Sequence, residues 1–412
     1  MTSAARPAFV LPVVLVLIGL LALTMAGFTF FMRAEIAGAQ AQRDGQQARL
    51  AAESGLEEVK LLLRKSRDDP SAWWNAPERF RHALVWSERY TREEDPVRKM
   101  GSRKDILALA NPIPAWRYSV VAEDLDGLPG TIRYGITPEA SKLNLNSASD
   151  AEIERLLTPL LLDLRIENAP ELVAALLDWR DADEDVRPGG AEAEYYNPLQ
   201  PPYLPKNGPL DTVEELLLVE GFNAAVLYGE DVNRNGILDA NEDDGDARFP
   251  YYDNADGVLN RGIAPYVTVW SREVGADKKN KAGLVNINTA PLLVLKALDG
   301  MTPEAAEAIV ARRAELDTAT LQSPNWPLQE GVVDAAGFAA LQKRITTKAL
   351  QFHVEIVGYA DHTKLARRDE WVIEMRGPLA QVLYHRDLTP LGLAWPVDDE
   401  TVVVTSPRAA AQ

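Results

Sequence analysis

Residues 8–32 read AFVLPVVLVLIGLLALTMAGFTFFM, an uncharged apolar stretch between Arg6 and Arg33. As a helix that rises about 1.5 Å per residue it is about 37 Å long, enough to cross the hydrocarbon core of a bilayer. A cleaved secretory signal has an apolar region of only about 7 to 15 residues, so this length favours a retained transmembrane helix. Arg6 precedes the stretch without any acidic residue, which favours a cytoplasmic N-terminus and places the rest of the chain across the membrane.

The sequence after Met32 continues without a proline until Pro70 and is rich in Ala, Gln, Glu, Leu and Arg, all good helix formers. We therefore expect one helix from about residue 9 to about residue 65, half in lipid and half packed on a folded domain. Its packed face is expected to consist of Ala52, Leu56, Val59 and Leu63. The alternative is two helices broken near Gly38 or Gly45.

Alternating apolar and polar residues predict strands near both ends of the remaining chain. Residues 116–137 are expected to form a hairpin, and the segments 350–361, 369–376 and 380–387 carry the period-two pattern; 266–274 is a further candidate strand. The sequence between is mostly helical in pattern, at 149–164, 170–181, 212–221, 291–300 and 303–315. This order predicts an α+β fold in which an antiparallel sheet domain is interrupted by a helical insertion.

The domain boundaries that follow from this pattern divide the chain into four parts. They are 1–33 for the leader and transmembrane helix, 34–137 for the following helix and the first strands, 138–345 for the inserted domain, and 346–412 for the last strands.

An internal repeat lies within the predicted insertion. LNLNSA at 143–148 returns as VNINTA at 285–290, and each copy is followed by helical sequence that ends in APELVAALLDWR or TPEAAEAIVARR. Two copies are too few for a solenoid but predict two related helix-hairpin-helix units.

The segment DVNRNGILDANE, residues 231–242, matches the twelve-position template of a calcium loop. Oxygen ligands are expected from Asp231, Asn233, Asn235, the carbonyl of Ile237, Asp239 and Glu242, with Gly236 at the sharp turn. A metal-free turn uses the same Asp, Asn and Gly residues, but it gives the twelfth-position Glu no role, so calcium is favoured. The following residues are rich in Gly, Pro and Asp, which predicts a structural ion rather than a calcium sensor.

A second acidic segment, DWRDADEDVRPGGAEAEYY, covers residues 178–196. Asp181, Asp183 and Asp185 have the odd spacing of oxygen ligands, but no turn glycine and distal Glu complete the template. A solvated acidic loop and a second calcium site both remain open.

The composition argues against nucleic-acid binding and catalysis. The formal net charge of −18 repels phosphate, and Thr302 stands where a phosphate-binding hairpin would have its second glycine. There is no cysteine, and the histidines are scattered at His82, His353, His362 and His385 without a catalytic motif. We expect no nucleic-acid partner and no enzymatic activity.

The long apolar helix, the acidic segment at 178–196, PPYLPKNGPLDTVEELLLVEGF, APYVTVWS, LVNINTAPLLVLKAL and FHVEIVGYAD together resemble general secretion pathway protein K, the minor pseudopilin of type II secretion. The resemblance implies a pilin-like sheet packed on the long helix, a large inserted helical domain and bound structural Ca²⁺. It also implies a single-pass protein of the bacterial inner membrane with its C-terminal domain in the periplasm.

The resemblance further implies partners. These are the other minor pseudopilins, of the I, J and H types, in a complex at the tip of the pseudopilus that moves folded proteins through an outer-membrane secretin; cargo and the channel are further candidates. A prepilin-type cleavage is expected between Ala8 and Phe9, where Ala replaces the usual Gly, and Val13 stands where ordinary pilin-like subunits carry Glu. The alternative function is a membrane-anchored helix-hairpin-helix DNA receptor of the competence type.

Overall fold

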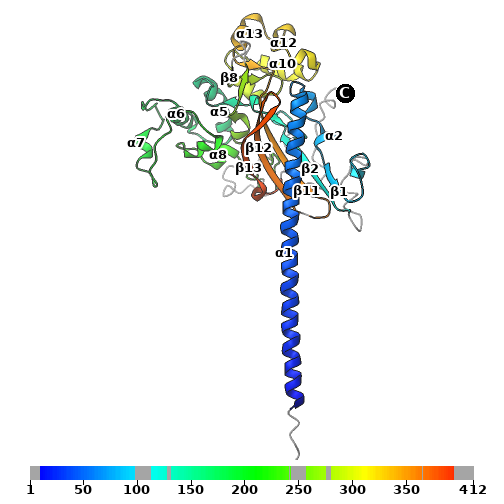
Figure 1. Cartoon of the computed structure of the whole chain (residues 1–412). Helices are drawn as coiled ribbons and strands as arrows, with labels where there is room; N and C mark the ends of the chain where they lie inside the picture. Colours follow the sequence, from blue (N-terminus) through cyan, green and yellow to red (C-terminus); the bar gives the residue numbers. More distant parts are fainter. Residues whose placement is uncertain are drawn as a thin grey trace, which may run out of the picture.

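The computed structural model describes residues 10–97, 113–127, 131–240, 242, 257–274, 280–363 and 365–393 of the 412-residue chain. Its first element is α1 (Val10–Ser66), a continuous helix whose first half projects from the domain (Figure 1). Neither Gly38 nor Gly45 breaks it, so the single-helix prediction is confirmed. The expected cleavage residues Ala8 and Phe9 lie outside the described residues.

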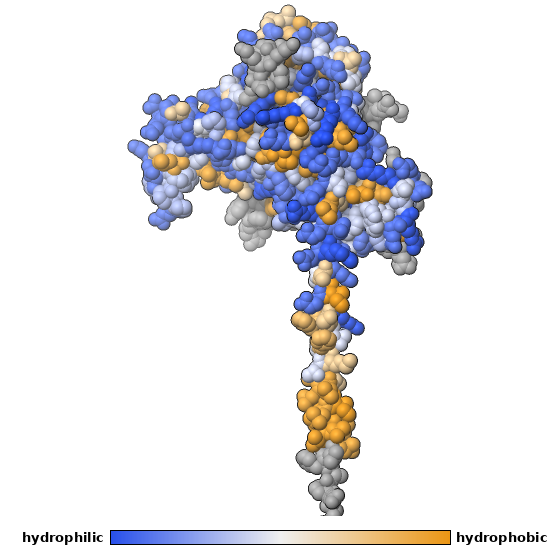
Figure 2. Space-filling view, viewed as in Figure 1, coloured by the Kyte–Doolittle hydropathy of each residue, from blue (hydrophilic) through white to orange (hydrophobic). Residues whose placement is uncertain are grey.

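The projecting part of α1 has two sections with different surfaces. From Leu11 to Met32 the surface is apolar and exposed (Figure 2), and this is the one helix among the described residues that is long and apolar enough to cross a membrane. From Arg33 to Arg43 every residue is also exposed, although the sequence is largely polar. Burial begins at Asp44 and Ala48, where α1 reaches the sheet.

The main sheet is antiparallel, in the order β1 (Ala83–Ser87), β2 (Ala115–Glu123), β11 (Gln351–Ala360), β12 (Ala366–Arg376) and β13 (Leu379–Asp387). Two short strands, β3 (Ile132–Arg133) and β4 (Thr137–Pro138), pair with β2 and β11. Because β2 pairs directly with β11, strands from before and after the helical region form one sheet. The predicted hairpin and the three predicted C-terminal strands are confirmed.

α1 packs on one face of this sheet, and the buried side of the helix is the predicted one: Ala52, Leu56, Val59 and Leu63 lie in the core with strand residues such as Val354 and Ile356. Gly358 of β11 allows the closest approach. A Cβ added there would lie 2.1 Å from the carbonyl oxygen of Ala48 in α1. The segments η1 (Pro70–Ala72) and α2 (Pro77–Phe80) then lead the chain into β1.

A buried ion cluster holds the edge of the sheet nearest α2. Arg117 of β2 is fully buried and binds Asp95 through two hydrogen bonds, of 2.6 and 2.8 Å, and Asp361 through one of 2.7 Å. The two carboxylates hold the pKa of the guanidinium above its usual range although burial opposes this. Removing one partner would leave an uncompensated buried charge, so the cluster fixes the loop that carries Asp95 against β2.

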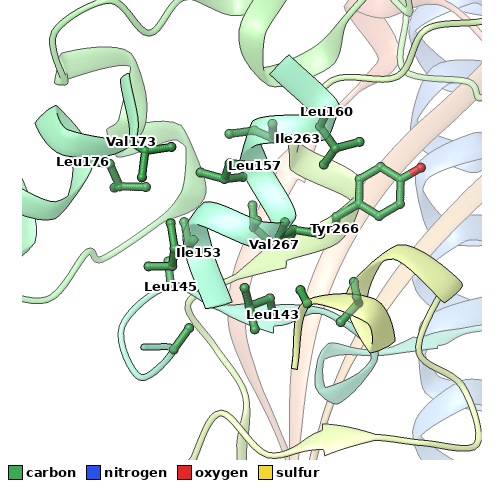
Figure 3. Close-up of a cluster of buried hydrophobic side chains, with 14 of the residues drawn as sticks. Leu143, Leu145, Ile153, Leu157, Leu160, Val173, Leu176, Ile263, Tyr266 and Val267 are labelled. Carbon is green, nitrogen blue, oxygen red and sulfur yellow. The ribbon is translucent and has the colours of Figure 1, made fainter. Parts of the chain in front are cut away.

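The inserted domain is the part of the chain between β4 and β11, and its core is the largest apolar cluster among the described residues (Figure 3). Its elements are η2 (Glu139–Ser141), β5 (Leu143–Asn144), α5 (Asp150–Asp163), α6 (Ala169–Arg180), α7 (Ala193–Tyr196), η3 (Val213–Leu218), α8 (Ala224–Tyr228), η4 (Ala264–Tyr266), β6 (Val267–Thr268), β7 (Arg272–Val274), β8 (Asn280–Ala282), β9 (Val285–Asn286), α9 (Leu292–Ala297), α10 (Pro303–Arg313), α11 (Thr318–Leu321), α12 (Trp326–Gln329), α13 (Ala335–Leu341) and β10 (Ile345–Thr346). After β13 comes η5 (Thr389–Leu391), the last element among the described residues.

Two sequence expectations differ from the structure. Of the helical segment expected at 212–221, only Val213–Leu218 is helical, as the short 3₁₀ helix η3. The strand expected at 266–274 is split into β6 and β7, because β6 pairs in parallel with β5 while β7 pairs with β8, so neither joins the main sheet.

The repeat is visible in the hydrogen bonds of its two copies. Arg180, at the end of α6, donates to the carbonyls of Leu145 and Ala148, and Arg313, at the end of α10, donates to the carbonyls of Ile287 and Ala290. Equivalent strands also pair alike, since β5 is parallel to β6 and β9 is parallel to β10. The assignment of the two units to the helix-hairpin-helix class stays a prediction.

The close packing of α1 on the sheet at Gly358 can be tested directly. Gly358→Ala is expected to lower the free energy of unfolding by about 3 kcal/mol, because the new methyl group overlaps the backbone of α1. The control is Gly45→Ala, where an added Cβ meets nothing within 4 Å and better helix propensity gives up to about 1 kcal/mol of stabilisation. Urea unfolding of both variants measures the difference; equal effects would contradict this account of the packing.

Candidate metal centre

The loop of residues 231–242 follows α8 and reaches the face of the sheet that α1 does not cover. Arg368 of β12 donates to the carbonyls of Asn233, at 2.7 Å, and Arg234. Ile237 packs against the apolar core of the sheet. The loop therefore belongs to the inserted domain in sequence but lies at its contact with the sheet.

Inside the loop, the side chains chosen from the template converge. The carboxylate of Asp231 accepts hydrogen bonds from the backbone amides of Asn235 and Gly236, and the side-chain amides of Asn233 and Asn235 both donate to Asp239. The carboxylate of Glu242 closes the loop by accepting from the amides of Val232 and Asp239. Side-chain hydrogen bonds thus join the third and fifth positions to the ninth, and the first and twelfth positions hold backbone amides of the loop. The assignment of these residues as calcium ligands stays a prediction.

The backbone of the loop also follows a tight course. Gly236 has a φ of +72°, which glycine adopts without strain, and Arg234 has a φ of +57°. A Cβ at Gly236 would come within 2.8 Å of Glu123 on β2. Glycine is required here both for the turn and for the approach of the loop to the sheet.

The loop concentrates negative charge away from water. Burial, together with the neighbouring carboxylate of Glu123, raises the pKa of Asp231 to about 7. Burial likewise raises the pKa of Glu242, a residue that is fully buried. Carboxylates in this condition favour either a proton or a bound cation, and hard oxygen ligands at this spacing suit Ca²⁺.

The donor set decides how well an ion would fit. Among the described residues, no group of three Asp, Glu, His or Cys side chains is arranged to hold a metal ion as it stands. The template draws on a wider set, since two ligands are Asn side chains and one is the carbonyl of Ile237. The residues present fit a calcium ion by type and order, and the amides of Asn233 and Asn235 must turn their oxygens inward to bind it.

The second acidic segment forms the loop between α6 and α7. Asp181 pairs with Arg187, Asp183 accepts a hydrogen bond from the amide of Asp185, and Asp185 is exposed. The structure brings Asp181 and Asp183 close enough to act on Glu192, whereas Asp185 is not among the charges with a marked effect there. The three predicted ligands therefore do not share one centre as they stand.

Glu192 is the acidic residue that the sequence analysis missed. It is 3% exposed, and neither carboxylate oxygen has a hydrogen-bond partner. Burial, together with the neighbouring carboxylates of Asp178, Asp181 and Asp183, raises its pKa to about 7. The odd-spacing rule considers only residues that lie close together in the sequence. Glu192 is too far along the chain from Asp181 to be found by that rule.

Two other features of the region bear on function. Thr302 caps α10 by accepting a hydrogen bond from the amide of Ala305, which gives it a local structural role. A cavity of about 230 Å³ lies beside the 231–242 loop and is lined by Glu123 and Glu355 of the sheet and by Asp231 of the loop. It marks the boundary between the two domains.

These features define a class: an anchored sheet domain carrying an inserted, internally duplicated helical domain with acidic loops. Two family models described as type II secretion system protein K match this chain, one over residues 141–228 and one over residues 285–344. Each match contains one copy of the repeat. The resemblance to the protein K family is thereby confirmed.

Two individual proteins are similar to this chain to different extents. A type II secretion system protein K from Klebsiella pneumoniae is 38% identical over 108 residues, which are 24% of this chain and 33% of that protein, so the match spans a third of the relative's length. A chain in the crystal structure of the GspK-GspI-GspJ complex from the enterotoxigenic Escherichia coli type 2 secretion system is 15% identical, with 85% of this chain and 98% of that chain covered and a TM-score of 0.45.

Proposed function

We propose that this chain is a minor pseudopilin of the type II secretion system, which caps the tip of the periplasmic pseudopilus and helps to start its assembly. The observation that carries the proposal is the match of both repeat units to protein K of this system. The long apolar helix supplies the inner-membrane anchor, and the folded domain then lies in the periplasm. Nothing in the comparisons favours the alternative DNA receptor, and Thr302 has its capping role instead.

The shape of the domain favours the tip. The elements α10, α12 and α13 lie beyond the C-terminal end of α1, at the end of the molecule farthest from the anchor (Figure 1). Gln322, just after α11, donates to the carbonyl of Asp68, which follows α1. A further subunit stacked above α1 would overlap this part of the inserted domain.

The membrane helix favours the same position. In a pilin-like filament, a Glu at the fifth position after cleavage pairs with the N-terminal ammonium group of a neighbour, which makes a charge in lipid tolerable. Val13 occupies that position here and cannot form this pair. A subunit that has no neighbour above it does not need the pair.

The tip assignment predicts a one-sided complex with the I-type and J-type minor pseudopilins. The detergent-solubilised chain, mixed with both partners, is expected to form a complex with one copy of this chain whose α10–α13 end stays free. Size-exclusion chromatography with mass measurement, followed by structure determination, tests this. Chains of this protein repeating along a filament, or partners bound at both ends of the domain, would overturn the assignment.

The second part of the proposal is that Ca²⁺ binds the 231–242 loop as a structural ion. Asp231, Asn233, Asn235, the carbonyl of Ile237, Asp239 and Glu242 would hold it, and the ion would supply positive charge to the buried carboxylates. The complete template and the convergence of these side chains support the site. Calcium outside the cytoplasm is plentiful enough for a weak site to be filled.

Calcium is expected to stabilise the protein through this loop. At about 100 times the dissociation constant, an ion that binds only the folded state adds about 2.7 kcal/mol. The double variant Asp231→Ala with Glu242→Gln should lose most of the calcium-dependent rise in Tm, whereas Glu167→Gln with Glu304→Gln, two exposed carboxylates of the same domain, should keep it. An undiminished calcium response in the first variant would rule out the loop as a calcium site.

We propose a second, weaker cation site around Glu192, with Asp181 and Asp183 as further ligands and Asp185 at its edge. The supporting observation is the buried and unpartnered carboxylate of Glu192.

This site predicts opposite effects of one substitution with and without calcium. At pH 8 in EGTA, Glu192→Gln should raise Tm, because it removes an ionised carboxylate whose pKa is about 7 and which has no partner. When calcium is added, the Tm of the Glu192→Gln variant should rise by less than the Tm of the original chain. The exposed neighbour Glu194→Gln serves as the control in calorimetry; a variant less stable than the original chain in EGTA, with an equal calcium gain, would exclude the site.

A further inference from the structure

We infer that the 231–242 loop is a calcium-dependent latch that fixes the inserted domain to the sheet, with Arg368 as the positioning residue that couples the two. The inference rests on the calcium site proposed above and adds a role to it: ion binding and domain docking stabilise each other.

Arg368 carries the connection. It is a β12 residue with 0% exposure, and its Nε donates to the Glu355 carboxylate of β11 at 2.7 Å. Its two remaining nitrogens donate to the carbonyls of Asn233 and Arg234, the third and fourth positions of the loop. One buried guanidinium therefore links two strands of the sheet to the part of the loop where a ligand side chain must be held.

The other side of the loop meets β2. Gly236 lies against the side chain of Glu123, and Glu123 also forms an ion pair with Arg261, a residue of the inserted domain. Ile237, which offers its carbonyl to the ion, inserts its side chain against the sheet core. Loop positions three to seven thus contact β2, β12 and the sheet core.

This arrangement couples the conformation of the loop to the docking of the inserted domain on the sheet. If the sheet is in place, Arg368 holds the backbone of Asn233 and Arg234 in the form that the ion requires. If the ion is bound, the same carbonyls are held ready for Arg368, whose buried charge otherwise lacks two of its acceptors. By thermodynamic linkage, the factor by which docking raises the calcium affinity equals the factor by which bound calcium raises the docking equilibrium constant.

Arg368 hydrogen-bonds to the loop at the backbone carbonyls of Asn233 and Arg234, and neither carbonyl is a proposed ligand atom. A substitution of Arg368 therefore leaves every proposed ligand in place. The matched control is Arg344, which forms a bidentate pair with the buried Glu152 inside the inserted domain, with distances of 2.9 and 2.5 Å, and does not touch the loop. Both substitutions remove a guanidinium from a carboxylate, which is fully buried at Glu152 and partly buried at Glu355.

The experiment is calcium titration calorimetry on the detergent-solubilised full chain, in a Glu192→Gln background so that only the loop is measured. Arg368→Met is expected to weaken calcium binding at least tenfold, whereas Arg344→Met should stay within twofold of the background protein. If Arg368→Met does not fold, Glu355→Gln keeps an acceptor for Arg368 without the charge and should weaken binding in the same direction, by a smaller factor.

The reciprocal measurement is hydrogen exchange with and without EGTA. Removing calcium should speed the exchange of amides in β12 and β2 around Arg368 and Glu123, and leave the amides of α5 and α6 unchanged. Calcium binding of unaltered strength in the Arg368 and Glu355 variants, or sheet amides insensitive to EGTA, would overturn the latch. Absence of calcium binding in the Glu192→Gln background would instead overturn the proposed calcium site itself.

Discussion

The approach of α1 to β11 at Gly358 is the contact on which the rest of the domain depends. The strand carries no side chain there, so the helix backbone lies directly against the sheet at Ala48 and Ala52. This contact sets the height and direction of the helix, and the apolar side chains of Leu56, Val59 and Leu63 then fill the space above the neighbouring strands. The contact at Gly358 therefore sets the position of the folded domain relative to the membrane helix.

The inserted domain uses the opposite face of the same sheet. Its two repeat units pack on each other, with Glu152 of α5 bound by Arg344 near the end of the second unit. The acidic loops lie outside this duplicated core, one at the sheet and one between α6 and α7. The duplicated units thus supply a rigid body, and the loops supply the charged surfaces that a cation can organise.

Much of the fold could be predicted from local pattern. The long helix, its buried face and the C-terminal strands follow from periodicity, because each buries one face over many residues. The strand expected at 266–274 is present only in part, as β6 and β7, because its pattern gave no information about its partners: β6 pairs with β5 and β7 pairs with β8. The 212–221 segment is helical over Val213–Leu218, but as a 3₁₀ helix, a distinction that helix propensity does not make.

Part of the candidate metal site could likewise be predicted from local sequence pattern, and part could not. The 231–242 loop is contiguous, so the calcium template could be read directly from the sequence. Glu192 and Arg368 could not be found that way. One is separated from its acidic neighbours by a glycine-containing loop, and the other is contributed by a strand more than a hundred residues away. Their roles depend on the tertiary structure, which no local pattern encodes.

The exposed section of α1 from Arg33 to Arg43 has a mechanical consequence. At about 1.5 Å per residue it forms a strut of about 16 Å between the apolar part of the helix and the first buried residue of the domain. The described part of the domain leaves this strut exposed along its length, which gives room for helices of neighbouring chains to run alongside it. If these helices moved along their axis together with α1, the movement would pass through the contact at Gly358 to the end of the molecule farthest from the membrane helix.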